Sequence, residues 1–333
     1  MPGSRRAAVL GSPIEHSLSP VLHTAAYAAL GLADWTYTAI ECDEAGLPAL
    51  IASCGRQWAS WGGLSLTMPL KRAVLPLLDH TEPLAVEVGG ANTVVFAGGE
   101  RLGYNTDVPG MVAALAEAGV TAPPGATILG AGATACAALA ALRVTGLASA
   151  VVLVRDQARA GDLLAAAGRL GMEVDLRPFD SEIRDGDLLV STVPAGAANF
   201  FAERAKGSRP SPAAVLDVVY APWPTPLAQA AAKSGAVVVS GFDLLLHQAA
   251  RQVELMTGLK PAPLTHMRTA GEAELTRRAA VAPPSTAPPS TAPPSTAPPS
   301  TAPPSTAPPS TAPLSTARAA SRTPTRSPSA PTV

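Results

Sequence analysis

The sequence predicts an α/β protein with two folded units, the second of which contains a parallel sheet covered by helices on both faces. At 333 residues, 47% of them hydrophobic, the chain is long enough for about two domains with ample core. Between residues 126 and 240, short continuous apolar runs alternate with helical patterns, as they do in parallel sheets. A glycine-rich turn joins the first of these strands to its helix.

This turn follows the strand expected at residues 126–129 and precedes an alanine-rich helix. Gly130 permits the tight turn, Gly132 lets the backbone approach a pyrophosphate at the helix start, and Ala135 fills the third small position. A purely structural turn is the alternative, because Gly-Ala-Gly alone is a weak pattern. The next predicted strand ends before Arg155, where the ribose of a dinucleotide is usually read, and this context favours nucleotide binding.

The other elements follow from the spacing of apolar residues. In the first unit, Gly98-Gly99 predicts a hairpin turn. The expected strands there are 7–10, 35–40, 63–67, 91–96 and 101–104, and the expected helices are 18–30, 47–54, 72–78 and 107–118. The second unit is expected to contain strands 126–129, 150–154, 188–191, 214–219 and 236–240, helices 136–142, 159–170 and 227–234, and a final amphipathic helix 241–258 with His247, Gln248, Arg251 and Gln252 on its polar side.

Beyond about Arg278 the composition changes abruptly, with Ala-Pro-Pro-Ser-Thr repeated in tandem over residues 282–311. Proline disfavours both helix and sheet, so a disordered Pro/Ser/Thr-rich tail with polyproline II character is expected. The tail is either a docking segment for a partner or an extension without an essential role, and we favour the second interpretation.

Composition excludes several function classes. The formal net charge is −1, which argues against nucleic acid as the main partner. Cys42, Cys54 and Cys136 are odd in number and lack CxxC spacing, so we expect reduced thiols and neither a disulfide framework nor a metal site. Prolines and glycines interrupt the uncharged stretch 120–142, which favours a buried strand–turn–helix over a membrane span. The apolar run 7–10 is too short for a signal peptide, so the cytoplasm is the expected compartment.

Two serines in the first unit are candidates for anion binding. Ser17 and Ser19 alternate with Leu18, which places both hydroxyls on one side of an extended segment. Such a pair suits a small oxygen-rich anion. The alternative is an N-cap role for Ser19 before Pro20, and both roles can hold together.

A lysine and a carboxylate lie close to the ends of predicted strands. Lys71 follows Thr67, and Asp107 closes a polar cluster that begins at Asn105; Asn92 stands at the start of another strand. Taken singly, such residues are more often a solvated charge and helix or turn caps. If Asp107 faces Lys71 across a cleft, however, the carboxylate holds and polarises the ammonium beside a reacting oxygen, next to a nicotinamide.

Taken together, these motifs resemble the shikimate dehydrogenase family. The resemblance covers residues 9–269 approximately, omits the repeat tail, and is specific as an ordered set rather than through any one motif. It rests on the order and spacing of Ser17 and Ser19, Thr67 with Lys71, Ala91-Asn92-Thr93, Asn105-Thr106-Asp107, the Gly130 turn, Asp217-x-x-Tyr220-x-Pro222, and Gly241 with Gln248.

The resemblance implies an organisation and an activity. It implies an N-terminal α/β substrate domain (1–107), a Rossmann-type parallel-sheet NADP domain (108–240), a C-terminal helix returning to the first domain (241–272) and the disordered tail (273–333). The implied enzyme is an oxidoreductase acting on a CH–OH group, which reversibly reduces 3-dehydroshikimate to shikimate with NADPH in the shikimate pathway to chorismate and the aromatic amino acids. We expect a monomer or homodimer whose partners are small molecules, not nucleic acid or membrane.

Carried over by position, the resemblance also implies residue roles. Lys71 and Asp107 would be the catalytic pair, with Lys71 near the C3 oxygen as proton donor or chiefly as an electrostatic stabiliser while hydride moves from the nicotinamide C4. The implied substrate-binding residues are Ser17, Ser19, Ser65, Thr67, Asn92, Tyr220 and Gln248. The implied cofactor-binding residues are Gly130, Ala131, Gly132, Ala133, Thr134, Arg155, Asp156, Thr192, Val193 and Gly241.

The chain departs from the family pattern in three places. Ser65 stands where the family usually has asparagine, so we expect a rearranged contact or a bridging water. Ala133 conservatively replaces a glycine. Val154-Arg155-Asp156 replaces the family's Asn-Arg-Thr/Ser: Arg155 can pair with a 2′-phosphate, whereas Asp156 would repel it, suit the ribose of NAD, or simply cap the next helix. With Arg159 nearby as further positive charge, NADP is preferred over NAD.

Two other functions remain open from the sequence. One is an NAD-dependent quinate/shikimate or aminoshikimate dehydrogenase of the same fold. The other is a catalytically silent nucleotide-binding protein whose tail recruits partners. The presence of both Lys71 and Asp107 argues against the silent protein.

Overall fold

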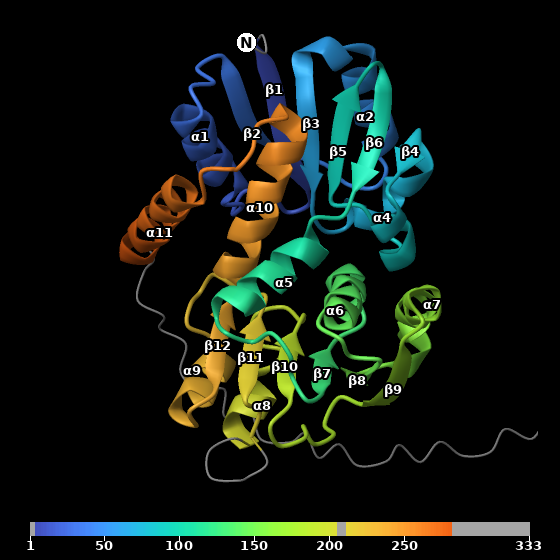
Figure 1. Cartoon of the computed structure of the whole chain (residues 1–333), viewed down its shortest axis with the longest axis vertical. Coiled ribbons are helices and arrows are strands. Elements are labelled where there is room, and N and C mark those ends of the chain that lie inside the picture. The colour runs from blue at the N-terminus through green and yellow to red at the C-terminus, as the bar shows by residue number, and fades with distance from the viewer. Residues whose placement is uncertain (1–3, 205–210, 282–333) are drawn as a thin grey trace, which may run out of the picture. The chain divides into compact units, whose positions relative to one another are not determined.

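The computed structural model describes residues 4–204 and 211–281 of the chain (Figure 1). The strands of these residues form two six-stranded sheets with helices packed on them. The predicted α/β class is therefore confirmed. From residue 282 onward, the predicted tail lies outside the described residues.

The first sheet contains the strands β1 (Arg5–Gly11), β2 (Trp35–Glu41), β3 (Trp61–Leu66), β4 (His80–Thr81), β5 (Thr93–Ala97) and β6 (Glu100–Tyr104). Their order is β2-β1-β3-β5-β6-β4, with β1 parallel to β2 and β3 but β5 antiparallel to β3 and β6. The predicted hairpin turn joins β5 and β6, since Gly98 and Gly99 have φ of 62° and 86°. The sequence patterns had not indicated the short edge strand β4.

The helices of this half are α1 (Ser19–Ala29), α2 (Leu47–Arg56), α3 (Leu70–Ala73) and α4 (Pro83–Val88). The continuous helix expected at 72–78 is wrong. α3 ends at Ala73, and Leu75–Leu77 form a separate 3₁₀ turn. Pro76 lies inside the expected helix and has no N–H to donate to the preceding turn, which explains the interruption.

The second sheet is entirely parallel, as the alternation of apolar runs predicts. Its order is β12-β11-β10-β7-β8-β9. The strands are β7 (Ala126–Leu129), β8 (Ser149–Val154), β9 (Glu173–Pro178), β10 (Leu188–Ser191), β11 (Ala214–Asp217) and β12 (Val237–Ser240). The helices are α6 (Ala133–Val144), α7 (Gly161–Leu170), α8 (Asn199–Arg204) and α9 (Pro226–Lys233), with a 3₁₀ turn at Gln157–Ala160.

β9 and α8 were not expected from the sequence. β9 lies at the sheet edge and has no fully buried residue, so it lacks the continuous apolar run of the central strands. The stretch 120–142, by contrast, is the strand–turn–helix that its prolines and glycines predict. No helix in the described ranges is both long and apolar enough to cross a membrane.

Three helices connect or cover the two sheets: α5 (Asp107–Glu117), α10 (Gly241–Thr257) and α11 (Leu264–Val281). In Figure 1, α10 runs from the second sheet toward the first and crosses α5 on the way. α10 begins with a capping box, in which Ser240 and Asp243 satisfy each other's backbone N–H groups.

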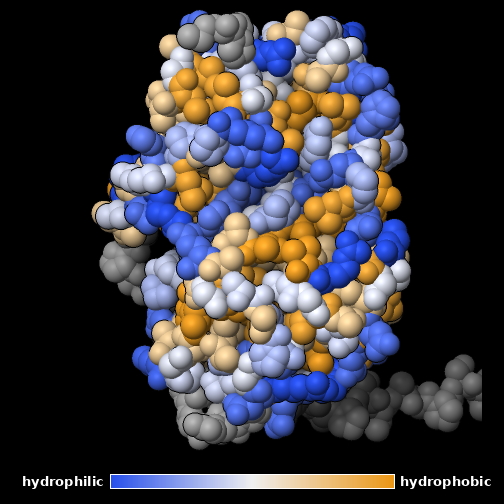
Figure 2. Space-filling model, viewed as in Figure 1, coloured by the Kyte–Doolittle hydropathy of each residue, from blue (hydrophilic) through white to orange (hydrophobic). Residues whose placement is uncertain are grey.

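Helix α11 packs on α1, and because it extends to Val281, residues 273–281 of the predicted tail are helical. Only Met267 and Gly271 of α11 are buried, so its sequence shows no apolar stripe. Ion pairs within the helix stabilise its last turns, as Glu274 pairs with both Arg277 and Arg278. On the face of the molecule shown in Figure 2, hydrophilic and hydrophobic side chains are interspersed.

The crossing of α5 and α10 depends on one glycine. Gly110 is buried in α5, and a Cβ added to it would lie 2.8 Å from the Gln248 backbone nitrogen and 3.0 Å from its Cα. These atoms belong to the backbone of α10, so they cannot turn aside as a flexible side chain can. The two helices can approach this closely only because the side chain is absent.

We therefore expect Gly110→Ala to lower the free energy of unfolding by about 1–3 kcal/mol through overpacking of the helix crossing. The change should be measured by urea unfolding of the purified protein.

Gly168→Ala in α7 is the matched control. Gly168 is exposed, and a Cβ there would meet nothing within 4 Å, so alanine should stabilise the helix by about 0.5–1 kcal/mol. Equal effects of the two substitutions would show that the α5–α10 crossing tolerates a methyl group.

Candidate active site

A cavity of about 300 Å³ lies where the carboxyl ends of strands from both sheets meet. From the first sheet, the segments after β1 and β3 contribute; from the second, Thr134 after β7, Val218 after β11 and Gly241 after β12. Ligands of open α/β sheets bind at such carboxyl ends. Of the predicted site residues, the cavity wall contains Ser17, Ser19, Ser65, Thr67, Lys71, Asp107, Thr134, Tyr220, Gly241 and Gln248.

The predicted pairing of lysine and carboxylate is present at this cavity. Lys71 in α3 donates from Nζ to Asp107 Oδ2 at 2.6 Å, and the two side chains are 14% and 4% exposed. Asp107 is the first residue of α5, where the helix dipole favours a negative charge. The Lys71 ammonium group is therefore fixed at the cavity wall by the Asp107 carboxylate.

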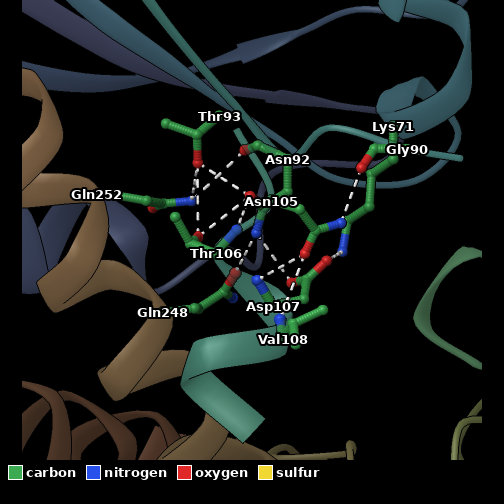
Figure 3. Close-up of polar contacts among 10 residues, drawn as sticks. All are labelled: Lys71, Gly90, Asn92, Thr93, Asn105, Thr106, Asp107, Val108, Gln248 and Gln252. Carbon is green, nitrogen blue, oxygen red and sulfur yellow. Dashed lines mark hydrogen bonds and ion pairs between the residues drawn. The ribbon is translucent and has the colours of Figure 1, made fainter. Parts of the chain in front are cut away.

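Asn92 fixes the second oxygen of this carboxylate (Figure 3). Its Nδ2 donates to Asp107 Oδ1 at 2.9 Å and to Gln248 Oε1 at 2.8 Å. Its Oδ1 accepts from the Thr93 hydroxyl and from both the backbone N–H and the hydroxyl of Thr106. Asn92 is fully buried and does not line the cavity, so it orients Asp107 and Gln248 from behind.

The polar cluster at 105–107 does cap α5, but through its first residue. Asn105 Oδ1 accepts from the backbone N–H groups of Asp107 and Val108, while its Nδ2 donates to the Gly90 carbonyl. Thr106 occupies the N-cap position without a side-chain cap. Because Asn105 supplies the cap, Asp107 keeps both carboxylate oxygens for Lys71 and Asn92.

Ser17 precedes α1 and Ser19 is its first residue, so the N-cap role weighed for Ser19 is wrong. Leu18 is the N-cap residue. The capping oxygen is that of Ser17, whose Oγ accepts from the Ser19 backbone N–H at 3.2 Å. Since Ser17 accepts through its oxygen, its hydroxyl proton stays available to a ligand in the cavity.

Tyr220 reaches the same region from the turn after β11. Its hydroxyl donates to the His16 carbonyl at 3.4 Å. The turn that carries it is held by Asp217, which accepts from the Val219 N–H and from the hydroxyl of Thr225. Burial raises the pKa of Tyr220, so its phenol remains a donor.

Gln252 is a site residue that the sequence pattern did not identify. It lines the cavity one helical turn after Gln248 and is 3% exposed. Its Oε1 accepts from Ser65 Oγ at 2.8 Å, and its Nε2 donates to the Thr93 hydroxyl at 3.2 Å. The spacing of Gln248 and Gln252 by four residues was the available signal, because it places both on one face of α10.

Ser65 and Gln252 belong to a buried polar chain that extends away from the cavity. The Tyr37 hydroxyl donates to Ser65 Oγ at 2.7 Å, and His23 Nε2 lies 3.3 Å from Gln252 Oε1. Burial lowers the pKa of His23 to about 3, so this ring is neutral. The expected contact of Ser65 with a substrate, rearranged or through a water, stays a prediction.

The glycine-rich turn has the geometry that its sequence predicts. Gly130 has φ of +99°, and a Cβ on it would lie 2.9 Å from Thr192 Oγ1 and 3.2 Å from Val193 Cγ1. Gly132 is the N-cap of α6; no side chain caps this helix end, and a Cβ on Gly132 would meet nothing within 4 Å. The first N–H groups of α6 are therefore open to a phosphate. Ala131 lies between the two glycines, and Ala133 and Thr134 are the first two residues of α6.

Asp156 is an N-cap residue, one of the three roles weighed for it. Its side chain accepts from the Ala158 N–H at 3.0 Å at the start of the 3₁₀ turn after β8. Arg155 precedes it at the end of the strand and is exposed, as is Arg159. The capping bond occupies one oxygen of the carboxylate, while Arg155 directly follows the carboxyl end of β8.

Known proteins match the chain over most of its described length. Residues 9–94 match the model of the shikimate dehydrogenase substrate binding domain, and residues 241–270 match that of the shikimate 5′-dehydrogenase C-terminal domain. The shikimate dehydrogenase (NADP(+)) of Geobacter metallireducens is 37% identical over 270 residues, which cover 78% of this chain and 93% of that protein.

Solved structures agree with these matches. The crystal structure of Mycobacterium tuberculosis shikimate dehydrogenase is 42% identical with a TM-score of 0.71, covering 81% of this chain and 99% of that one. Shikimate 5-dehydrogenase from Thermus thermophilus, in complex with NADP(H) and shikimate, is 35% identical with a TM-score of 0.68, covering 81% and 99%. With the paired Lys71 and Asp107 and the glycine-rich turn, these similarities show that the chain belongs to the shikimate dehydrogenase family.

Proposed function

We propose that this chain reversibly reduces 3-dehydroshikimate to shikimate with NADPH, and that Lys71 and Asp107 are its catalytic pair. The observation that carries the proposal is the ion pair between these residues in the cavity where the carboxyl ends of both sheets meet. The relatives named shikimate dehydrogenase (NADP(+)) support the reaction and the cofactor, as does the T. thermophilus structure with both ligands.

Reduction of a ketone requires a hydride at carbon and a proton at oxygen. NADPH, when bound, supplies the hydride. Lys71 donates a hydrogen bond to the substrate's C3 oxygen and stabilises the negative charge that develops there as it supplies the proton. Asp107 holds the ammonium at 2.6 Å and, because Asn92 occupies its other oxygen, keeps one orientation throughout. In the reverse direction the same pair accepts the hydroxyl proton.

Other residues of the cavity wall have the polarity that the substrate requires. We assign the substrate's carboxylate to the hydroxyls of Ser17, Ser19 and Tyr220, which line the cavity; Tyr220 would turn its O–H from the His16 carbonyl to the ligand. We assign its ring hydroxyls to Thr67 and Gln248, which line the cavity, with Asn92 orienting Gln248 from behind. Gln248 accepts from Asn92 through Oε1, so its Nε2 is the group available to a substrate oxygen.

Ser65 acts with Gln252 in this proposal. Ser65 donates its one hydrogen bond to Gln252 Oε1 and accepts one from the Tyr37 hydroxyl. Toward a substrate hydroxyl it can therefore act only as an acceptor. This polarity distinguishes Ser65 from an asparagine, which presents donors as well. Gln252 thereby takes part in setting which substrate hydroxyl fits beside β3.

The described residues fit NADP. The uncapped start of α6 and the open space at Gly132 can accept a pyrophosphate. Thr192 and Val193 pack closely on Gly130, and Gly241, which follows β12, packs closely on the Val218 backbone, so we include these residues in the cofactor site. We assign the 2′-phosphate to Arg155, whose guanidinium can bind it in bidentate fashion. Asp156 serves as the cap of the next turn.

We further propose that the protein acts in the cytoplasm as a monomer or homodimer. The three cysteines are buried and unpaired, which suits a reducing compartment. Sedimentation of the purified chain distinguishes the two oligomeric states.

Activity is tested by following absorbance at 340 nm with shikimate or quinate and NADP or NAD in all four combinations. We expect fast turnover with shikimate and NADP alone. Preference for quinate or NAD would instead indicate the related quinate/shikimate enzymes, and nucleotide binding without any turnover would indicate a silent protein.

The Lys71→Ala variant should lose about 10²–10⁴-fold in kcat, because the proton donor and the stabilising charge are both removed. Its affinity for NADP, measured by calorimetry, should stay near that of the wild type. Lys233→Ala on the exposed face of α9 is the control and should change neither quantity. A normal kcat for Lys71→Ala would exclude Lys71 from the mechanism.

Arg155→Gln should raise KM for NADP by about tenfold or more while leaving KM for NAD within about twofold, since only NADP carries the charged 2′-phosphate. Steady-state kinetics with both cofactors checks this expectation.

Asp156→Asn complements that test, because asparagine keeps the N-cap and removes the charge. For a residue that only caps, the kinetics with NAD should stay unchanged. A fall in kcat/KM with NAD would show that Asp156 binds the ribose.

A further inference from the structure

The last turn of α11 contacts the segment that carries the two serines. Arg278 Nη1 donates to the His16 carbonyl oxygen at 2.7 Å, and Nη2 donates to the Ser17 carbonyl oxygen at 3.4 Å. The Arg278 side chain is 29% exposed. The backbone of residues 16–19, which we call the serine loop, is thus held by the C-terminal helix.

The guanidinium of Arg278 is itself oriented by a carboxylate. Its Nε donates to Glu274 Oε1 at 2.7 Å, one helical turn earlier in α11. Nε, Nη1 and Nη2 therefore each have a different acceptor, an arrangement that suits a planar fork of N–H groups. A lysine at this position can reach a carbonyl but cannot make all three bonds.

The contact joins α11 to groups that face the cavity. The His16 carbonyl accepts from Arg278 and also from the Tyr220 hydroxyl, at 3.4 Å. Tyr220, Ser17 and Ser19 line the cavity, whereas Arg278 does not. The contacts of Arg278 with the cavity wall therefore run through the serine loop, whose His16 carbonyl it shares with Tyr220.

A small shift of this loop would move both serine hydroxyls together. Ser17 Oγ accepts from the Ser19 N–H, so the two side chains are coupled through the loop backbone. Two of the loop's carbonyls accept from Arg278, and the loop belongs to a different segment of the chain from α3 and α5, which carry Lys71 and Asp107. Loss of Arg278 should thus disturb substrate binding rather than proton transfer.

We propose that Arg278 is a positioning residue for the substrate's carboxylate, because it fixes the backbone from which Ser17 and Ser19 present their hydroxyls. This inference rests on the proposed function, in which those serines bind the carboxylate. It makes the final turn of α11 a functional part of the substrate site, although the composition of the chain changes immediately after it.

Arg277 provides a matched control. It is the adjacent arginine, its side chain is 64% exposed, and its bonds within the described ranges go to both oxygens of the same Glu274. Arg277→Met and Arg278→Met therefore remove the same charge from the same turn of α11. Only Arg278→Met removes the bonds to the serine loop.

The experiment compares full-length Arg278→Met, Arg278→Lys and Arg277→Met with the wild type by steady-state kinetics. For Arg278→Met we expect KM for shikimate to rise about tenfold, as for the loss of hydrogen bonds from a charged donor, with kcat within about threefold and KM for NADP unchanged. Arg278→Lys should recover part of the loss, and Arg277→Met should behave as the wild type.

Equal KM for shikimate in Arg278→Met and Arg277→Met would overturn the inference, as would a loss confined to kcat or a matching rise in KM for NADP. If circular dichroism shows that Arg278→Met is unfolded, Arg278→Lys and Arg278→Gln decide by the same comparison. Absence of turnover in the wild type would contradict the proposed function instead, and a normal wild type with an unaffected Arg278→Met contradicts this inference alone.

Discussion

A carboxylate with 4% exposure has to be paired, and the pairing of Asp107 is the constraint on which the site depends. Lys71 binds one oxygen, Asn92 binds the other, and Asn105 caps the helix start beneath it. These partners come from α3, from the residue before β5 and from the segment before α5. Removing Lys71 or Asn92 would leave one oxygen of the buried carboxylate without its partner, so the same bonds close this end of the first sheet and hold the ammonium in place.

Helix α10 extends this constraint to the second sheet. It begins at the end of β12 with a capping box and passes α5 at the distance that Gly110 allows. It brings Gln248 to Asn92 and Gln252 to Ser65. A single helix thus connects the carboxyl edge that carries the glycine-rich turn with amide and hydroxyl groups of the first sheet. The cavity is consequently bounded by both halves, as hydride transfer between two bound molecules requires.

Polar side chains behind the cavity decide what its wall can donate or accept. Ser65 donates its hydrogen bond to Gln252, whereas Ser17 accepts from the Ser19 backbone N–H and can still donate to a ligand. Two hydroxyls of the same chemical type therefore face the cavity with opposite hydrogen-bonding roles. The difference comes from Gln252 on α10 and from the backbone of the loop itself. Arg278 likewise contacts the loop from outside the cavity.

The sequence by itself determined the features that rest on local order: the strand–turn–helix at Gly130, the hairpin at Gly98-Gly99, the all-parallel second sheet, and the spaced motifs containing Lys71 and Asp107. These follow from backbone preferences and apolar spacing within a few residues. Only the tertiary structure decided that Gln252 lines the cavity and that Arg278 reaches residue 16, since 262 positions separate that arginine from its acceptor. Helix α11 also lacks an apolar stripe, so its place on α1 is set by packing partners that local sequence does not reveal.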